Sequence, residues 1–281
     1  MVQPSFFLTG AGSSKRKNAR NPIIITCDES GIQIDCLFTF NRKAMRTTGD
    51  AGAPFADIIE SGIRRNWSGT YDLTDALRQS LRSFCPPRAP GSDEKLTVTV
   101  TTARDQGGRL PPSLRVLTRL LTGRRRPARI YVRRSIILPA HAASFFLRRF
   151  WGFFRTGQIE SIGLNWSPRF PGYITIPGNT KISRLPQVAA HEAGHLFGLG
   201  DAYDAWYRFF HAAPGTDRFM MRHNACVQPL EIAMLLRAHT TGKMSYFPRA
   251  WIWKDIGRGI LSAARAPLKR LFDRWKKKEK I

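Results

Sequence analysis

The largest shortage in this 281-residue chain is of acidic residues, which number 20 against 45 lysines and arginines. The resulting formal net charge of +25 excludes a balanced surface and favours anionic partners: nucleic acid, an acidic membrane surface or an acidic protein. Long apolar runs are also missing, so no membrane-spanning helix is expected. Apolar residues still make up 42% of the chain, which is enough to form a buried core.

Cysteine is scarce, and the few cysteines follow no recognisable pattern. The spacing of Cys27, Cys36, Cys85 and Cys226 matches neither a CxxC metal site nor a redox motif. We expect free or partly buried thiols, although a Cys27–Cys36 bridge stays open. The first ten residues contain too short an apolar run for a signal peptide, and the basic residues come after it. The chain is therefore expected to be cytoplasmic, or secreted by a signal-independent route.

The order of expected elements indicates an α+β fold in which strands and one helix precede a motif-bearing helix. Alternation of apolar and polar residues predicts strands, and apolar residues at helical spacing predict helices. The expected strands are 32–40, 96–101, 129–138, 159–166 and 173–176. The expected helices are 55–67, 144–154, one that begins near Leu185-Pro186 with Ser183 as a cap, and 228–239.

Composition divides the chain into three parts. Residues 1–21 are polar and basic and are predicted to form a flexible tail. Residues 22–245 are predicted to form the main domain. Residues 246–281 interleave aromatic and basic residues, with Pro267 expected to separate two helices. A basic amphipathic helix suits an anionic membrane surface or an acidic protein, or else its apolar face packs back onto the domain. Nucleic acid is disfavoured, because no zinc finger, helix-turn-helix or RNP-like motif is present.

The segment His191-Glu192-Ala193-Gly194-His195 carries the clearest chemistry in the sequence. Histidines four residues apart on a helix lie on the same face, where two imidazoles can bind one Zn²⁺ ion. Glu192 directly follows the first histidine and can act as a general base on a zinc-bound water. Gly198 can adopt a positive φ and end the helix, which allows Asp201 to turn back as the third ligand.

Other residues compete for the role of third ligand. The rivals to Asp201 are His211, Asp204 and Glu231. Glu231 is the most serious of them, because another class of metallopeptidase takes a glutamate from a later helix as its third ligand. That alternative gives no purpose to Gly198 or to the methionine pair Met220-Met221.

The pattern His191-Glu192-x-x-His195-x-x-Gly198-x-x-Asp201 resembles the long motif of the metzincin zinc metallopeptidases, with aspartate in place of the commoner third histidine. The resemblance implies a zincin-type fold: a twisted mixed sheet, an active-site helix, and a small C-terminal subdomain after a methionine turn. Met221, slightly preferred over Met220, would form that turn. The family's edge strand aligns an extended peptide, and residues 159–166 are the candidate for it.

The expected function is therefore that of a zinc-dependent endopeptidase acting on a protein or peptide. Glu192 would take a proton from the attacking water and pass it to the leaving amine, with Tyr203 or His223 as candidate oxyanion stabilisers. Residues 58–71 and the segment from His191 to Tyr203 also resemble metallopeptidase domains of bacterial toxins and secreted effectors. The alternatives are a membrane- or nucleic-acid-binding protein with an incidental HExxH segment, and a structural metal domain, which would need no base such as Glu192.

Overall fold

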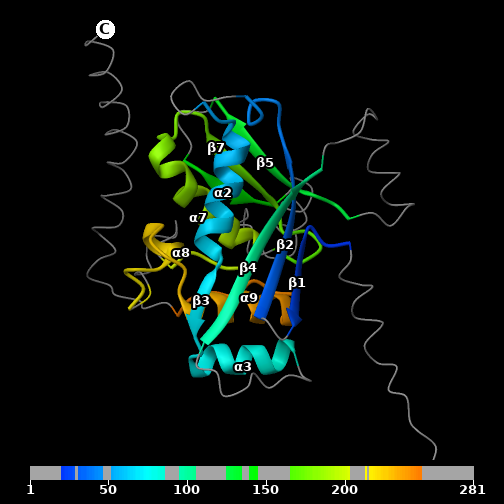
Figure 1. Cartoon of the computed structure of the whole chain (residues 1–281), viewed down its shortest axis with the longest axis vertical. Coiled ribbons are helices and arrows are strands. Elements are labelled where there is room, and N and C mark those ends of the chain that lie inside the picture. The colour runs from blue at the N-terminus through cyan, green and yellow to red at the C-terminus, as the bar shows by residue number, and fades with distance from the viewer. Residues whose placement is uncertain are drawn as a thin grey trace, which may run out of the picture.

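The computed structural model describes residues 20–28, 31–46, 52–85, 95–105, 125–134, 139–144, 165–202, 213 and 215–248. Within these residues the fold is α+β, with one mixed sheet and helices on one of its faces (Figure 1). The strands are β1 Ile23–Asp28, β2 Gly31–Phe40, β3 Gly69–Asp72, β4 Lys95–Arg104, β5 Ala128–Arg133, β6 His141–Ala143 and β7 Tyr173–Pro177. The α-helices are α2 Phe55–Trp67, α3 Asp75–Phe84, α7 Leu185–Leu196, α8 Met220–His223 and α9 Pro229–Thr241, and a short 3-10 helix, η1 Ile182–Arg184, precedes α7.

The sheet is parallel in its centre and antiparallel at its edges. Its order is β3-β4-β2-β5-β7-β6, and β1 pairs with β2 beside β5. Strands β4, β2, β5 and β7 run parallel, whereas β3, β1 and β6 are antiparallel to their neighbours. The carboxyl ends of the four parallel strands therefore meet at one edge of the sheet, and β6 forms the last strand on one side.

The core lies between the sheet and the packed pair of helices α2 and α7. Strand β2 alternates buried and half-buried residues, so Ile34 and Phe38 face the helices. Helices α2 and α7 approach closely where Gly62 meets Pro186; a Cβ atom at Gly62 would overlap the Pro186 backbone. Trp67 closes this interface by donating its indole N–H to the Ala190 carbonyl at 2.9 Å, so α2 holds the helix that carries the HExxH segment.

Most of the expected elements that fall on described residues are confirmed. Strands over 32–40, 96–101 and 173–176 and helices over 55–67, 185–196 and 228–239 are present, with bounds that differ by a few residues. The strand expected over 129–138 ends at Arg133, and residues 135–138 lie outside the described residues. The cap was wrong: Arg184 occupies the N-cap of α7 and makes no side-chain cap bond, because the 3-10 helix η1 leads directly into α7. Strands β1, β3 and β6 and helices α3 and α8 were not expected.

Several expectations concern residues that lie outside those described. They are the N-terminal tail up to residue 19, the helix over 145–154, the strand over 159–164, Tyr203, Asp204, His211, and the C-terminal segment from 249 onward. Asn165 and Trp166, the described end of the expected edge strand, are not in a strand. No helix within the described part of the chain is both long enough and apolar enough to cross a membrane.

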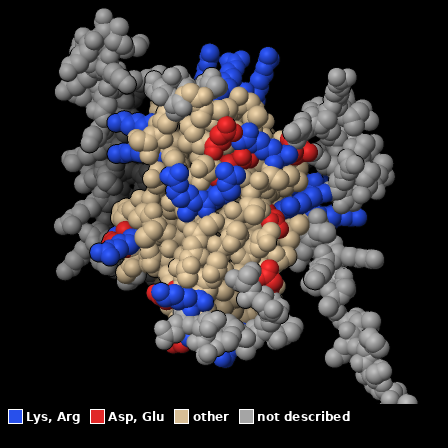
Figure 2. Space-filling model, in the orientation of Figure 1, with Lys and Arg blue, Asp and Glu red and all other residues tan. Residues whose placement is uncertain are grey.

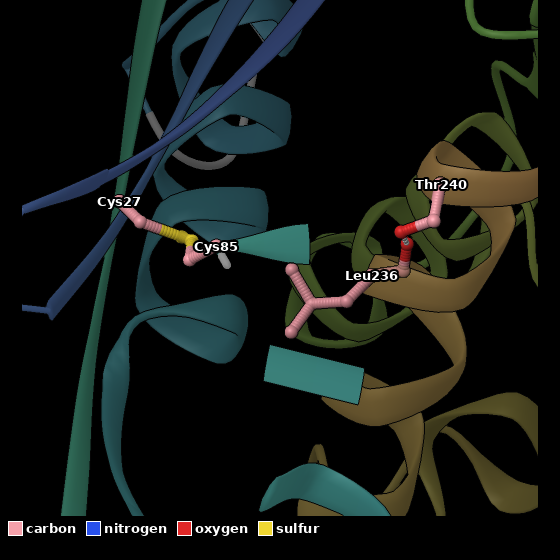
Figure 3. The surroundings of a disulfide bond; sticks show 4 residues. All are labelled: Cys27, Cys85, Leu236 and Thr240. Atoms are coloured by element: carbon pink, nitrogen blue, oxygen red, sulfur yellow. Dashed lines mark hydrogen bonds between the residues drawn. A yellow bond between two sulfur atoms is a disulfide. The ribbon is translucent and has the colours of Figure 1, made fainter. Parts of the chain in front are cut away.

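The cysteines form a bridge that differs from both expectations. Cys27 of β1 and Cys85, at the C-cap of α3, are joined by a disulfide that spans 58 residues of sequence. A Cys27–Cys36 bridge is excluded by the pairing of Cys27 with Cys85, and Cys36 is instead a free thiol on the buried face of β2. Figure 3 shows the bond at the end of α3, with Leu236 and Thr240 of α9 nearby. Linear spacing could not reveal this pair, since α3 reaches β1 only through the tertiary fold.

Candidate metal centre

The three residues expected to bind a metal converge in the fold. His191, His195 and Asp201 each offer one ligand atom, and these atoms all lie within 4.8 Å of one another. The Nε2 atoms of His191 and His195 are 3.3 Å and 3.2 Å from Asp201 Oδ1. Both histidines are buried on α7, and Asp201 is half-buried in the segment that follows.

Backbone carbonyls fix both imidazole rings from behind. His191 Nδ1 lies 2.9 Å from the Met220 carbonyl oxygen, and His195 Nδ1 lies 2.8 Å from that of Leu199. A carbonyl can only accept a hydrogen bond, so each Nδ1 carries the proton and donates it. The Nε2 atoms point toward Asp201. In the neutral form of each ring, Nε2 carries the lone pair, so both rings have the orientation that a metal ligand requires.

A glycine turn brings Asp201 back to the histidines. Gly198 has φ +97°, as its position in the motif predicted, and a side chain there would also overlap Trp166 and Ala238. Beyond the turn, the Gly200 N–H donates to the Ser245 carbonyl at 2.8 Å, and the Ala202 N–H donates to the Met221 carbonyl at 3.0 Å. Asp201 lies between these two anchors, so its carboxylate is held in place by the backbone on both sides.

The three groups form a strongly coupled electrostatic cluster. Burial tends to raise the pKa of Asp201, but the imidazoles of His195 and His191 outweigh burial and hold it well below its ordinary value. Burial likewise tends to lower the pKa of His195, but the Asp201 carboxylate raises it to about 9. In the metal-free protein a proton on His195 therefore takes the place of the cation that this negative site attracts.

Glu192 lies next to the cluster and is not part of it. Its carboxyl group is buried, and burial raises its pKa above the ordinary glutamate value, although His191 and His195 partly oppose this. Among the described residues, its Oε2 atom has no hydrogen-bond partner. A buried carboxylate that has a raised pKa and an oxygen without a hydrogen-bond partner is suited to accept and release a proton.

Glu231 is not placed as a metal ligand, which removes the main rival to Asp201. Its fully buried carboxylate accepts hydrogen bonds from the backbone N–H groups of Met221 (2.8 Å), Gln228 (2.8 Å) and Met220 (3.4 Å). Burial raises the Glu231 pKa to about 7 despite these three bonds. Since the Met220 carbonyl orients His191, Glu231 positions a metal-ligand histidine through the backbone of α8.

The methionine segment passes beneath the HExxH helix. A Cβ atom at Gly194 would overlap the Met221 sulfur, so Met221 packs directly against α7 between the two histidines. Met220 is also buried, and it contributes its carbonyl to His191. The two methionines therefore have different roles, and Met221 is the one that lies under the helix, as the sequence slightly favoured.

The residues present fit a metal ion. Two neutral imidazoles and one carboxylate, with a fourth position open, form a donor set typical of catalytic zinc sites. The buried Oδ1 atom of Asp201 faces the Nε2 atoms of both histidines, and a cation bound among these three atoms would satisfy all of them. His191, His195 and Asp201 can thus hold a metal ion, and no other group of three histidine, cysteine or acidic residues in that part meets the same criterion.

The surroundings of the site differ from expectation in two respects. The strand at the edge of the sheet is β6, which packs against α7, so residues 165–166 do not supply the edge. His223, one candidate for oxyanion stabilisation, is exposed at the end of α8, and Tyr203, the other, is not among the described residues. His141, on β6, was not singled out in the sequence, yet its charge acts on Glu192.

Comparison with known proteins adds no assignment: no protein-family model and no curated protein matches the chain.

Proposed function

We propose that the protein is a zinc-dependent endopeptidase of the metzincin type. The observation that carries this proposal is the convergence of His191, His195 and Asp201 beside the buried carboxylate of Glu192, whose Oε2 atom has no hydrogen-bond partner among the described residues. A purely structural metal site needs no base next to its ligands. The positive φ of Gly198 and the packing of Met221 under α7 support the metzincin type, because the family's motif requires both features.

The residues of the site divide the chemistry among them. A zinc ion held by the three ligands would act as a Lewis acid on the scissile carbonyl and lower the pKa of water. Glu192 accepts a proton from the attacking water and delivers it to the leaving amine, for which its raised pKa is suitable. The Met220 and Leu199 carbonyls keep both imidazoles in the ligating tautomer throughout.

The substrate is a peptide in extended conformation. Strand β6 is antiparallel to β7 and forms the edge of the described sheet nearest α7, so a peptide can add to it by backbone hydrogen bonding. This assignment replaces residues 159–166 as the strand that aligns substrate.

The disulfide supports a site of action outside a reducing cytosol. Stable disulfides are typical of exported proteins and are rare where thiols are kept reduced. The Cys27–Cys85 bond therefore favours an exported protein over a cytoplasmic peptidase, consistent with a secreted toxin or effector.

The proposal is tested by metal content and by one substitution. Elemental analysis of the purified full chain should give one equivalent of zinc, which chelation removes together with the cleavage of an unfolded protein substrate. Glu192→Gln should retain zinc and fold but lose about 100-fold or more in turnover, the scale of a positioned acid–base group. A zinc-loaded Glu192→Gln protein with near-normal turnover, or a chain that binds no metal, would refute the proposal.

A further inference from the structure

Three loops form a continuous surface at the carboxyl edge of the parallel strands, opposite α3. The Asn41 side chain, after β2, pairs with both the N–H and the carbonyl of Val132 in β5, at 3.0 Å and 2.9 Å. The Gly178 N–H, after β7, donates to the Arg133 carbonyl at 2.6 Å. The Lys43 side chain lies against Gly178, because a Cβ atom added to Gly178 would overlap the Nζ atom of Lys43. These contacts hold the loops after β2, β5 and β7 together.

This surface is strongly basic. We call it the basic edge, formed by Arg42, Lys43, Arg46, Arg133, Arg134, Lys181 and Arg184. All but the half-buried Lys43 are exposed, and residues 41–46, 133–134 and 178–184 contain no aspartate or glutamate. Figure 2 shows Lys and Arg side chains projecting from this end of the molecule, at the top of the view.

Among the described residues, the acidic groups near this edge do not neutralise it. Asp57 and Glu60, in the first turns of α2, are ion-paired with Arg104 at the end of β4, which is not one of the seven basic residues. Asp105 follows Arg104, one strand further from β5. The basic edge thus keeps a local excess of positive charge that its own ion pairs do not cancel.

An apolar side chain protrudes from the same loops. Met45 is 48% exposed and, with Tyr246, is one of two large hydrophobic residues that the described part of the chain leaves exposed. Met45 lies between Lys43 and Arg46 in the sequence, so the same loop presents an apolar group and positive charges. The three loop segments contain no aromatic residue on which a nucleic-acid base could stack.

We propose that the basic edge docks on an anionic lipid bilayer. Headgroup phosphates and carboxylates would attract the arginines and lysines, and Met45 would enter the boundary between headgroups and acyl chains. A duplex nucleic acid offers phosphates but no apolar phase for Met45, so the bilayer accounts for both features of the surface.

Docking in this orientation also places the metal centre near the membrane. Helix α7 begins one residue after Arg184 and runs away from the basic edge, so His195 lies about 15 Å along it at roughly 1.5 Å per residue. A substrate segment close to the bilayer surface would then be within reach. This consequence rests on the proposed peptidase function, whereas docking itself does not.

The test compares two variants of the full chain that have equal net charge. The first neutralises the basic edge and carries Arg42→Gln, Arg46→Gln, Arg133→Gln and Arg134→Gln. The control neutralises four exposed residues, in α3, at the start of β4, in α9 and in the turn after α9. It carries Arg82→Gln, Lys95→Gln, Arg237→Gln and Lys243→Gln. Binding is measured by sedimentation with vesicles of phosphatidylcholine, alone or mixed with phosphatidylserine, and zinc content and circular dichroism report the fold.

The basic-edge variant should bind anionic vesicles several hundredfold more weakly, at about fivefold per basic residue near the surface. The control should lose little, because its residues lie beyond the screening length of about 10 Å from the docked face. Met45→Ser should weaken binding even at high salt, where electrostatic attraction is screened. Equal losses in the two four-residue variants, full binding by the first, or unchanged binding by Met45→Ser would overturn the proposal. The proposal would also be overturned if the basic-edge variant lost binding to duplex DNA and kept its binding to vesicles.

Discussion

At the scale of single residues, two substitutions distinguish the proposed third ligand, Asp201, from Glu231, which binds the backbone near the site. Asp201→Ala removes the carboxylate that lies within 3.3 Å of both histidines, so zinc affinity should fall by at least about 10-fold. Glu231→Gln removes a group that binds backbone N–H atoms, so it should keep one equivalent of zinc. Competition with a chromogenic chelator measures both. Loss of zinc in Glu231→Gln with unchanged affinity in Asp201→Ala would reverse the assignment.

The sequence predicted which residues converge at the candidate metal centre because these residues are local. His191, His195, Gly198 and Asp201 occupy fixed offsets on one helix and the turn after it, so their geometry follows from helical periodicity and one positive φ. The groups that orient these ligands are not local. The Met220 carbonyl and the Glu231 carboxylate come from later elements, and only the fold brings them to His191.

Glu231 still left a local signal. Gln228, Pro229 and Glu231 stand at the N-cap, N1 and N3 positions of α9, the pattern of a capping box, which the structure contains. That pattern predicts a glutamate engaged with backbone N–H groups rather than with a metal.

At the scale of elements, helix α9 carries two buried titratable groups whose effects on stability oppose each other. Burial raises the Glu231 pKa from 4.5 to about 7, so this group makes the fold less stable as pH rises from about 4.5 to 7. Burial lowers the His239 pKa from 6.5 to about 4, despite its bond to the Phe197 backbone. His239 therefore makes the fold more stable as pH rises from about 4 to 6.5. Its Nε2 atom is fully buried, although the residue as a whole is only partly so.

Removing one of the two groups should reveal the other. The pKa change of Glu231, from 4.5 to about 7, and that of His239, from 6.5 to about 4, each correspond to about 3 kcal/mol of stability. The two effects on the pH dependence of the unfolding free energy therefore nearly cancel between pH 4.5 and 6.5. Relative to wild type, Glu231→Gln should gain stability by up to about 3 kcal/mol between pH 4.5 and 7. Urea unfolding of the zinc-free proteins across this range measures the difference. A difference that does not change with pH would show that Glu231 stays ionised in the fold.

The disulfide between β1 and α3 should contribute substantially to stability. A crosslink that closes a loop of 58 residues restricts the unfolded chain by about 4 kcal/mol in the chain-entropy description. Cys85→Ser should lower the free energy of unfolding by up to that amount, measured by denaturant titration. Reductant should destabilise wild type, which has the bond, and should leave Cys85→Ser unchanged. Cys226→Ser, at an exposed free thiol, is the matched control and should leave stability unchanged. Equal stability of all three proteins would contradict the role assigned to the bond.

At the scale of the whole molecule, the α+β class and most described helices and strands followed from periodicity, whereas the sheet order did not. Strands β2 and β4 were predicted from the sequence because their apolar residues alternate with polar ones and form one buried face. Strand β1 and helix α3 were missed: β1 is short, and α3 buries only Leu77 and Leu81. The placement of β5 beside β2, with β4 on the other side, depends on contacts between distant segments that no local pattern encodes.

The Cys27–Cys85 bond also makes part of the molecule a covalent ring. The ring contains β2, α2, β3 and α3, which precede the helix that bears the metal ligands. A peptidase cut anywhere inside it would open the chain without releasing a fragment, because both pieces stay joined through sulfur. A chain nicked there would migrate as one species on a non-reducing gel and as two after reduction. The segment between the two cysteines, whose helix α2 supports α7, is thus protected against loss by a single cleavage.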